Sequence, residues 1–270
     1  MDLSDYRVKP GAKLRLNQIS TDEDGGLSRD EAEDMLDDLL DEMDELQERL
    51  YAERERSLLV VLQAMDAGGK DSTIRNVFGP LNPQGVRVAS FKVPTPKESR
   101  HDFLWRIHRK APEAGMIRVF NRSHYESVLI EKVKELAPKE QIAGRYAHIR
   151  NFEALLEDAG TTVVKVMLNI SKDYQLERFR RRLRRPDKHW KFNPGDLDDR
   201  ALWVDYMKAF EKAMSETSTE TAPWYIVPAE TRWYRNLVVA QIVRDALAGI
   251  DPQYPEPDFD PAAFDPDELE

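Results

Sequence analysis

The sequence of 270 residues contains no cysteine. This absence excludes disulfide bonds, thiolate metal sites and a cysteine nucleophile. The sequence also lacks an apolar run close to the ~18 to 20 residues that span a bilayer. Its start, MDLSDYRVKPGAKLRL, has no apolar block of the kind found in secretory signals. We therefore expect a cytoplasmic protein with no membrane partner.

The sequence lacks an excess of positive charge: acidic residues outnumber basic ones and the net charge is -10, which argues against generic nucleic-acid binding. The charge is unevenly distributed, however. Acidic residues concentrate at 30–48 and 251–270, whereas residues 178–191 (RFRRRLRRPDKHWK) are densely basic. The middle of the chain is therefore suited to a polyanion, and we expect no specific nucleic acid as partner.

Strand and helix patterns alternate along most of the chain. Apolar, partly β-branched segments predict strands at 58–62, 86–93, 116–120, 162–170 and 224–227. Helical patterns lie at 28–56, 72–78, 97–110, 125–137, 139–158, 173–185, 197–214 and 232–248. This alternation predicts an α/β fold with a mainly parallel sheet.

The chain divides into three regions by composition. Residues 1–26 form a polar, irregular N-terminal arm, residues 27–250 form the folded domain, and the acidic, proline-rich residues 251–270 form an extended or disordered tail. The apolar stripe of the helix at 28–56 fits either packing on its own sheet or a contact between subunits. A homo-oligomer is therefore one of two interpretations of that helix.

The stretch QAMDAGGKDST, residues 63–73, follows the strand at 58–62 and precedes a helical pattern. This order is typical of a phosphate-binding loop, in which backbone N–H groups and a helix N-terminus face the anion while lysine adds charge. The usual spelling G-x-x-x-x-G-K-[ST] is broken at Ala64 and Asp71. We assign phosphate binding to the loop and to the first residues of the helix: Ala67, Gly68, Gly69, Lys70, Asp71, Ser72 and Thr73. The alternative is an ordinary glycine-rich turn.

Asp66 places a carboxylate inside this loop, which makes chemical sense mainly with a metal ion. Mg²⁺ prefers oxygen ligands and bridges phosphates, so Asp66 is a candidate ligand, with Mn²⁺ as the other metal considered. The alternative role for Asp66 is to cap the loop through backbone hydrogen bonds.

A second polar group, NRSHYE at residues 121–126, follows the strand at 116–120. Ligands gather at the carboxyl ends of strands in open α/β sheets, so we expect this group beside the loop. Asn121 is a candidate metal ligand, and Arg122 is suited to hold phosphoryl oxygens. A polar turn that caps the next helix is the alternative, and His124 fits a structural role better than that of a general base.

The third group is the basic segment at 178–191. On a helix, Arg178, Arg181, Arg182 and Arg185 share one face, which suits a grip on several phosphates. Together with Lys188 and Lys191 they predict a lid, at about residues 173–214, that closes over the phosphates. A solvated basic face or a non-specific nucleic-acid patch is the alternative.

With these groups in view, the sequence resembles the polyphosphate kinase 2 family. The residues that carry the resemblance are QAMDAGGKDST at 63–73, FKVPTPKE at 91–98, HDFLWRIHRKAP at 101–112, VFNRSHYE at 119–126 and KHWKFNPGDL at 188–197. The resemblance covers roughly residues 5–250, and both departures from the usual loop spelling are features of that family. It implies a three-layer α/β/α P-loop kinase fold with a helical lid.

The resemblance also implies Mg²⁺-dependent transfer of the terminal phosphoryl group of inorganic polyphosphate to a nucleotide. Asp66, Lys70, Arg122, Arg178 and Arg182 would then be catalytic. Many members have Asp where Asn121 stands, so its metal role carries over less directly. The Asn form with SHYE is most similar to the subgroup that converts AMP to ADP and ADP to ATP.

Two other functions fit the residues alone. One is an ATP-dependent nucleotide or small-molecule kinase on the same fold, and the other is a non-catalytic module that binds polyanions. The basic segment favours a longer polyanion over the first. A non-catalytic module that binds polyanions would give no reason for the carboxylate of Asp66 in the loop.

Overall fold

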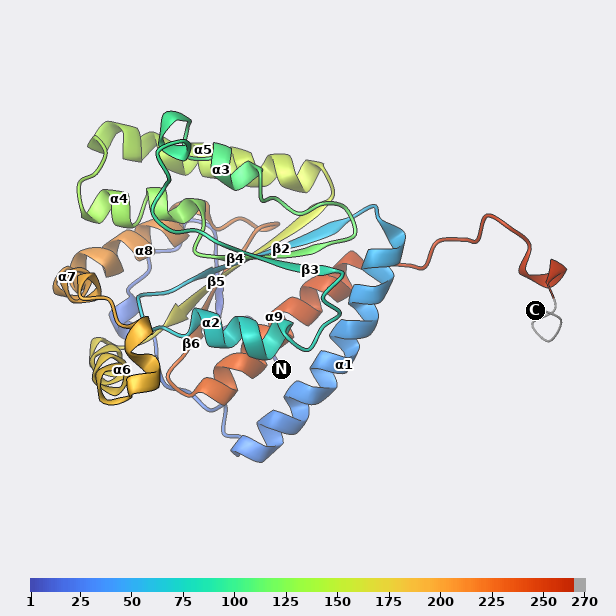
Figure 1. The fold of residues 1–270 in the computed structure, drawn as a ribbon, viewed down its shortest axis with the longest axis horizontal. Coiled ribbons are helices and arrows are strands. Elements are labelled where there is room, and N and C mark those ends of the chain that lie inside the picture. The colour runs from blue at the N-terminus through green and yellow to red at the C-terminus, as the bar shows by residue number, and fades with distance from the viewer. Residues whose placement is uncertain (265–270) are drawn as a thin grey trace.

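The computed structural model describes residues 1–264 and contains a six-stranded sheet with helices on both faces (Figure 1). The strands lie in the order β1-β6-β5-β2-β4-β3, and all neighbours are parallel except β1 and β6. Their bounds are β1 Arg7–Val8, β2 Ser57–Gln63, β3 Val86–Ser90, β4 Ile117–Asn121, β5 Thr161–Asn169 and β6 Trp224–Pro228. The expected α/β fold with a mainly parallel sheet is confirmed.

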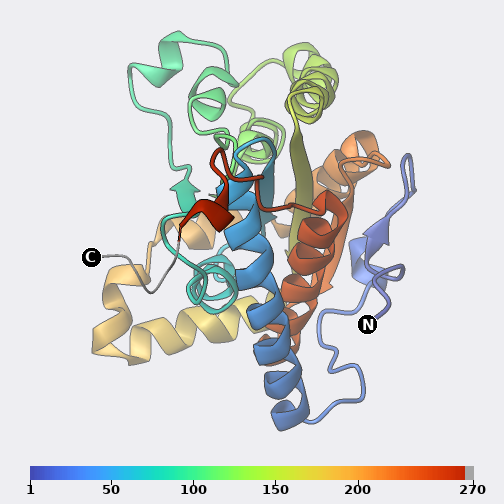
Figure 2. The ribbon, with the colours of Figure 1, turned by 90° about the vertical axis from the view of Figure 1, so that its right-hand side faces the viewer.

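The helices form two layers. On one face α9 packs against the sheet and α1 packs against α9, as the adjacent blue and red helices show (Figure 2). On the other face α5 packs on β5, and α8 packs on α4 and α5. The bounds are α1 Arg29–Glu53, α2 Lys70–Thr73, α3 Trp105–His108, α4 Ile130–Val133, α5 Lys139–Asp158, α6 Lys172–Arg184, α7 Gly195–Ala201, α8 Trp203–Thr217 and α9 Arg232–Ile250.

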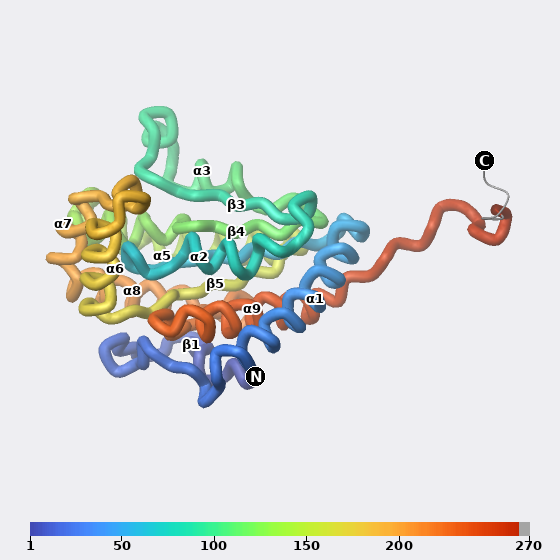
Figure 3. The backbone as a smooth tube through the Cα atoms, turned by 60° about the horizontal axis from the view of Figure 1, so that its bottom comes forward, coloured from blue at the N-terminus to red at the C-terminus, as the bar shows by residue number. Residues whose placement is uncertain are grey.

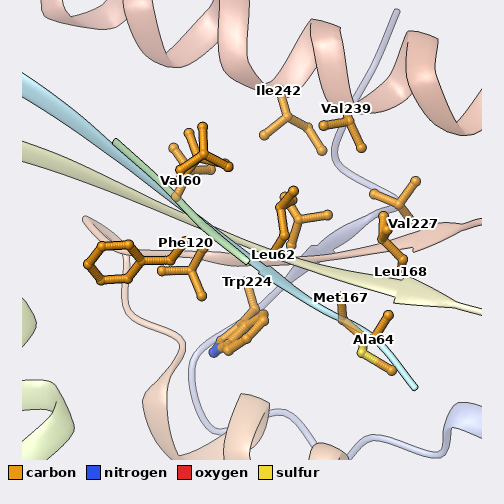
Figure 4. Packing of buried hydrophobic residues seen from close by; sticks show 14 of the residues in the cluster. Val60, Leu62, Ala64, Phe120, Met167, Leu168, Trp224, Val227, Val239 and Ile242 are labelled. Atoms are coloured by element: carbon orange, nitrogen blue, oxygen red, sulfur yellow. The ribbon is translucent and has the colours of Figure 1, made fainter. Parts of the chain in front are cut away.

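The central strands are buried on both faces, as their unbroken apolar sequences require. Side chains of β2 such as Val60 and Leu62 face Val239 and Ile242 of α9 (Figure 4). Phe120 and other side chains point to the opposite layer in the same view. Because the sheet is covered on both sides, chemistry is confined to its edges and to the carboxyl ends of its strands.

The first long helix is positioned by local signals that the sequence displays. Ser28 and Glu31 form a capping box, in which the Ser28 hydroxyl accepts from the Glu31 N–H and the Glu31 carboxylate accepts from the Ser28 N–H. Leu39, Met43 and Leu50 are buried where α1 meets α9. The apolar stripe of this helix is thus used within the chain, and a homo-oligomer stays a prediction.

The prediction of one continuous helix at 97–110 is wrong. The chain forms a 3-10 turn at Glu98–Arg100 and then the short α3. Between them His101 is extended, and the Asp102 carboxylate accepts from the N–H groups of Leu104 and Trp105. An Asp that caps a new turn in this way competes with a continuous helix.

The helix expected at 125–137 is also wrong. A 3-10 helix spans His124–Ser127 and α4 follows, because Leu129 leaves helical geometry (φ -102°, ψ -89°) and Glu135 is left-handed (φ 52°). The helix expected at 197–214 is divided into α7 and α8 at Leu202. The lid is predicted at about residues 173–214. Of this range, α8 packs on α4 and α5 and so belongs to a helical layer, and the part outside the layers is mainly α6 and α7.

The arm at residues 1–26 is not wholly irregular, because β1 pairs antiparallel with β6. Residues 251–264 contain one 3-10 turn, Pro261–Ala263, and run away from the body past α1 (Figure 3). The rest of the predicted tail, 265–270, lies outside the described residues. Within the part of the chain that is described, no helix is long and apolar enough to cross a membrane.

Candidate active site

A polar cleft of about 690 Å³ opens where β2 and β4 end, beneath α6 and the 3-10 helix Pro186–Lys191. It brings together the three groups of residues singled out in the sequence. Its lining contains Asp66, Ala67, Gly68, Gly69, Lys70, Asp71, Ser72, Asn121, Arg122, Arg178, Arg181, Arg182, Arg185, Lys188 and Lys191. A cleft with this many cations selects for a ligand with several negative charges.

The loop from β2 to α2 needs glycine at Gly69 for two reasons. Its φ of +102° lies in the left-handed region, and a Cβ there would collide with the guanidinium of Arg235. The N–H groups of Ser72 and Thr73 both point back to the Gly69 carbonyl, which starts α2. The loop thus ends at a helix N-terminus that faces the cleft, the arrangement that suits a phosphate.

Lys70 is buried at the base of the loop. Its Nζ donates to the carbonyl oxygen of Ala64 at 2.8 Å and to that of Met65 at 3.4 Å. Burial, with the nearby charge of Arg122, lowers the pKa of Lys70 to about 8. The ammonium therefore carries its charge at neutral pH and loses it a little above.

Arg122 lies between two carboxylates. It takes a left-handed backbone conformation (φ 62°) directly after β4, and its guanidinium donates to Asp66 and, at 3.0 Å, to Glu126. Burial opposes the charged form, but Glu126 and Asp66 together raise the pKa of Arg122 above its usual range. These contacts fix the guanidinium at the end of the loop, where it faces the cleft.

Asn121 and Asp71 are joined across the cleft, because the Asn121 amide Nδ2 donates to Asp71 Oδ1 at 2.8 Å. The amide oxygen of Asn121 stays available as an acceptor. Among residues 1–264, no group of three His, Asp or Glu side chains is arranged to hold a metal by itself. Mg²⁺ in phosphate sites commonly uses one or two carboxylates together with phosphate and water, and the oxygens of Asp66, Asp71 and Asn121 suit that mode.

The basic segment is held in place by specific contacts. Arg182 donates to the Lys191 carbonyl at 3.1 Å, and Gln175 of α6 donates to the Asp66 carbonyl at 2.9 Å. Asp196 lies near Arg182, and burial, with the neighbouring charge of Asp66, raises the pKa of Asp196 to about 6. The segment and the loop therefore form one continuous lining.

Two residues considered in the sequence lie elsewhere. Thr73 is buried, outside the lining of the cleft, and its hydroxyl donates to the Gly69 carbonyl at 3.3 Å. His124 is buried and its Nε2 lies 3.1 Å from Glu153 Oε1. Glu153 also accepts from Tyr125 and forms an ion pair with Lys165. His124 is thus part of a buried network, in agreement with a structural role.

Several residues of the site were not found from the sequence. Three further cations, Arg75, Lys92 and Arg232, line the cleft. Arg235 lies behind the loop and donates to Ser72 Oγ at 3.0 Å. For Arg232 and Arg235, the position just after β6 was the available signal, since the carboxyl ends of parallel strands meet at one edge of the sheet.

A family model for polyphosphate kinase 2 matches residues 26–255. The chain belongs to the polyphosphate kinase 2 family. Among curated members, an AMP/ADP-polyphosphate phosphotransferase from Meiothermus ruber is 51% identical over 257 residues, which is 94% of this chain and 96% of that protein. An ADP-polyphosphate phosphotransferase from Rhodopseudomonas palustris is 42% identical and covers 93% of this chain and 91% of its own.

The fold of this polyphosphate kinase 2 family member matches a solved structure of the same family. The crystal structure of polyphosphate kinase 2 from Arthrobacter aurescens superposes with a TM-score of 0.92 at 44% identity, over 96% of this chain and 93% of that one. The three-layer α/β/α P-loop kinase fold predicted from the resemblance is confirmed.

Proposed function

We propose that the protein transfers the terminal phosphoryl group of inorganic polyphosphate to AMP and to ADP, which forms ADP and ATP. The observation that carries this proposal is the cation-lined cleft, in which the phosphate loop and the basic segment share one surface. A single nucleoside triphosphate has too few phosphates to contact so long a row of cations, whereas a polymer of phosphates can contact them all. The names of the relatives from Meiothermus ruber and Rhodopseudomonas palustris support the same substrates.

The reaction is written as direct in-line transfer. A phosphate oxygen of the acceptor forms a bond to the terminal phosphorus, and the bond from that phosphorus to its bridging oxygen breaks, so the shortened polyphosphate leaves with the electron pair. A phosphate monoester loses its second proton at a pKa of about 6, so the acceptor is already a nucleophilic anion at neutral pH. No general base is then required, which agrees with the burial of His124 away from this cleft.

The chain's own cations stabilise the charge that develops. Lys70 and the N–H groups at the start of α2 face the transferring phosphate, and Arg122 is held ready by Asp66 and Glu126. Arg178 and Arg182 hold the polymer from the opposite side of the cleft. Groups fixed before the substrate arrives need little reorganisation during the reaction. Electrostatic stabilisation by such preorganised groups is the main source of catalysis in phosphoryl transfer.

A divalent cation, Mg²⁺ or alternatively Mn²⁺, is part of the proposal. Asp66 would hold it, with Asn121 and Asp71, which are hydrogen-bonded to each other in the same cleft, as further oxygen donors. When bound, it neutralises charge on the phosphates.

The test is phosphorus NMR on purified protein with Mg²⁺, long-chain polyphosphate and either AMP or ADP, with no other phosphate donor. We expect ADP from AMP and ATP from ADP. If only ADP reacts, the AMP part of the proposal is wrong. If neither reacts and ATP phosphorylates a small acceptor instead, an ATP-dependent kinase replaces the proposal.

The basic segment offers a matched pair of arginines. Arg181 and Arg180 are adjacent and exposed on α6, but only Arg181 lines the cleft. We expect Arg181→Ala to weaken polyphosphate binding and to reduce the slope of log K against log salt by about 1, because one phosphate contact is lost. Arg180→Ala should change neither quantity. Equal effects of the two variants would show that α6 binds only through its general charge.

A further inference from the structure

Arg235 of α9 is a buried arginine in contact with the phosphate loop. Its side chain is 1% exposed and comes from α9, which packs against α2. Its Nη2 donates to Ser72 Oγ at 3.0 Å, and its Nη1 occupies the space that a Cβ on Gly69 would need. The guanidinium therefore supports the loop from behind.

In the described part of the chain, the charge of Arg235 has no acidic partner. Within residues 1–264, no Asp or Glu oxygen lies within 4.0 Å of its guanidinium. Its other hydrogen bonds go to the neutral amide oxygen of Asn236, at 2.7 Å and 3.2 Å. The like charges of Arg232 and Arg178 act against the charge of Arg235.

This arrangement costs free energy in the unliganded protein, because a buried charge is stabilised mainly by an opposite charge or by water. Burial, with Arg232 and Arg178, lowers the pKa of Arg235 to about 10, so the group is still charged at neutral pH. The loop that Arg235 touches is the surface on which a phosphate would lie. A bound phosphate would supply the missing negative charge.

We propose that Arg235 is a positioning residue for the phosphate loop and that its counter-ion is the polyphosphate bound on the opposite side of that loop. The inference rests on the proposed function, since it names a further determinant of that same site. The hydrogen bond to Ser72 sets the loop geometry, and the positive charge draws the phosphate chain onto the loop. Arg235 does not touch the substrate in this arrangement.

The proposal predicts different effects on the free energy of unfolding and on the affinity for polyphosphate, whereas a purely structural role for Arg235 predicts that both fall together. Arg235→Met removes a costly buried charge, so the free energy of unfolding without ligand should stay level or rise. The same variant should bind long-chain polyphosphate roughly tenfold more weakly, the size expected of one unit charge within about 10 Å of the anion in a half-buried site. Arg235→Lys keeps the charge and should retain most of the affinity. In turnover, the KM for polyphosphate should rise while the KM for AMP stays unchanged.

The experiment is urea unfolding with and without polyphosphate, together with calorimetric titration of polyphosphate. Arg244→Met is the matched control, because Arg244 lies on the same helix but pairs with Glu42 at 3.2 Å and with Asp245 at 3.3 Å. It should leave polyphosphate affinity unchanged. If Arg235→Met does not fold, Arg235→Gln takes its place, since its amide can still bond Ser72.

The outcomes distinguish this inference from the proposed function. If the unaltered protein does not bind polyphosphate, the proposed function fails. If it binds and the neutral variant binds equally well, the inference alone is overturned. Lower stability without ligand and unchanged affinity would also overturn it, as would a lysine variant as weak as the neutral one.

Discussion

Lys70→Ala is expected to lower kcat by about 10² to 10³, the usual cost of one preorganised contact to the charge that develops in a transition state. The side chain is buried at the start of α2 and lines the cleft beside Arg122. Without a ligand its ammonium is held by the carbonyls of Ala64 and Met65. These bonds preorganise the charge beside the loop before substrate arrives.

The same lysine predicts a pH dependence. Because the pKa of Lys70 in the free protein is lowered to about 8, its charge is lost as pH rises through that value. We expect kcat/KM for polyphosphate, which reports the free enzyme, to fall as pH rises through about 8. A bound phosphate favours the charged form and raises this pKa, so kcat should stay level to higher pH.

Initial rates at saturating and limiting polyphosphate, measured across this pH range, test both expectations. Lys139→Ala is the control, since Lys139 is exposed at the start of α5 and does not line the cleft. A Lys70→Ala enzyme with unaltered kcat would remove the loop lysine from the mechanism. A level kcat/KM well above pH 8 would show that the ammonium keeps its proton in the free enzyme.

Glu153→Gln is expected to lower the free energy of unfolding by about 3–5 kcal/mol, the usual cost of leaving one partner of a buried ion pair alone. Lys165 is 0% exposed and its Nζ lies 2.5 Å from Glu153 Oε2. Glu153 also serves His124 and Tyr125, while Lys165 donates to the Thr217 carbonyl at 2.8 Å. The substitution leaves an ammonium inside the protein with no carboxylate.

A double variant shows whether the loss comes from the unpaired charge. Combining Glu153→Leu with Lys165→Met removes both charges. The double variant should therefore lose less free energy of unfolding, by about 1–3 kcal/mol, than the sum of the losses in Glu153→Leu alone and Lys165→Met alone. Urea unfolding measures each variant. Glu33→Gln, which breaks the exposed pair with Arg29, should leave stability nearly unchanged. Strictly additive losses would show that the pair is not coupled.

This buried network also bears on the active site through the chain. His124 and Tyr125 follow Arg122 after one intervening residue, Ser123, and both are hydrogen-bonded to Glu153 of α5. The Ser123 hydroxyl accepts from the Tyr125 N–H at 3.2 Å. The segment that carries Arg122 is thus fastened to the helical layer on one side, while Asp66 and Glu126 hold the side chain on the other.

The sequence predicted the parts of the site that depend on local pattern. A buried strand followed by Gly68-Gly69-Lys70 determines a loop at the end of β2, and the polar group after β4 must lie beside it because β2 and β4 are parallel neighbours. The arginines of α6 share a face by helical spacing. All three groups line one cleft. Their individual roles stay predictions.

What the sequence did not predict depends on contacts between distant residues. Arg235 and Ser72 are separated by 163 positions, so no local pattern links them. The helix predicted at 125–137 is interrupted at Leu129, and the 3-10 helix before it holds His124 and Tyr125 in contact with Glu153. Such tertiary contacts outweigh helical propensity. The role of Asp102 as a cap depends on its backbone geometry, which its residue type alone does not reveal.

The pairing of β1 with β6 has a consequence for synthesis of the chain on the ribosome. Arg7–Val8 emerges early, yet the strand with which it pairs, Trp224–Pro228, is made much later. Until β6 is made, β1 lacks the strand with which it pairs in the described structure, and without β1 the outer edge of β6 would be open to strands of other chains. Once β6 is made, the early arm covers the start of that edge, at Trp224 and Tyr225, within the same molecule.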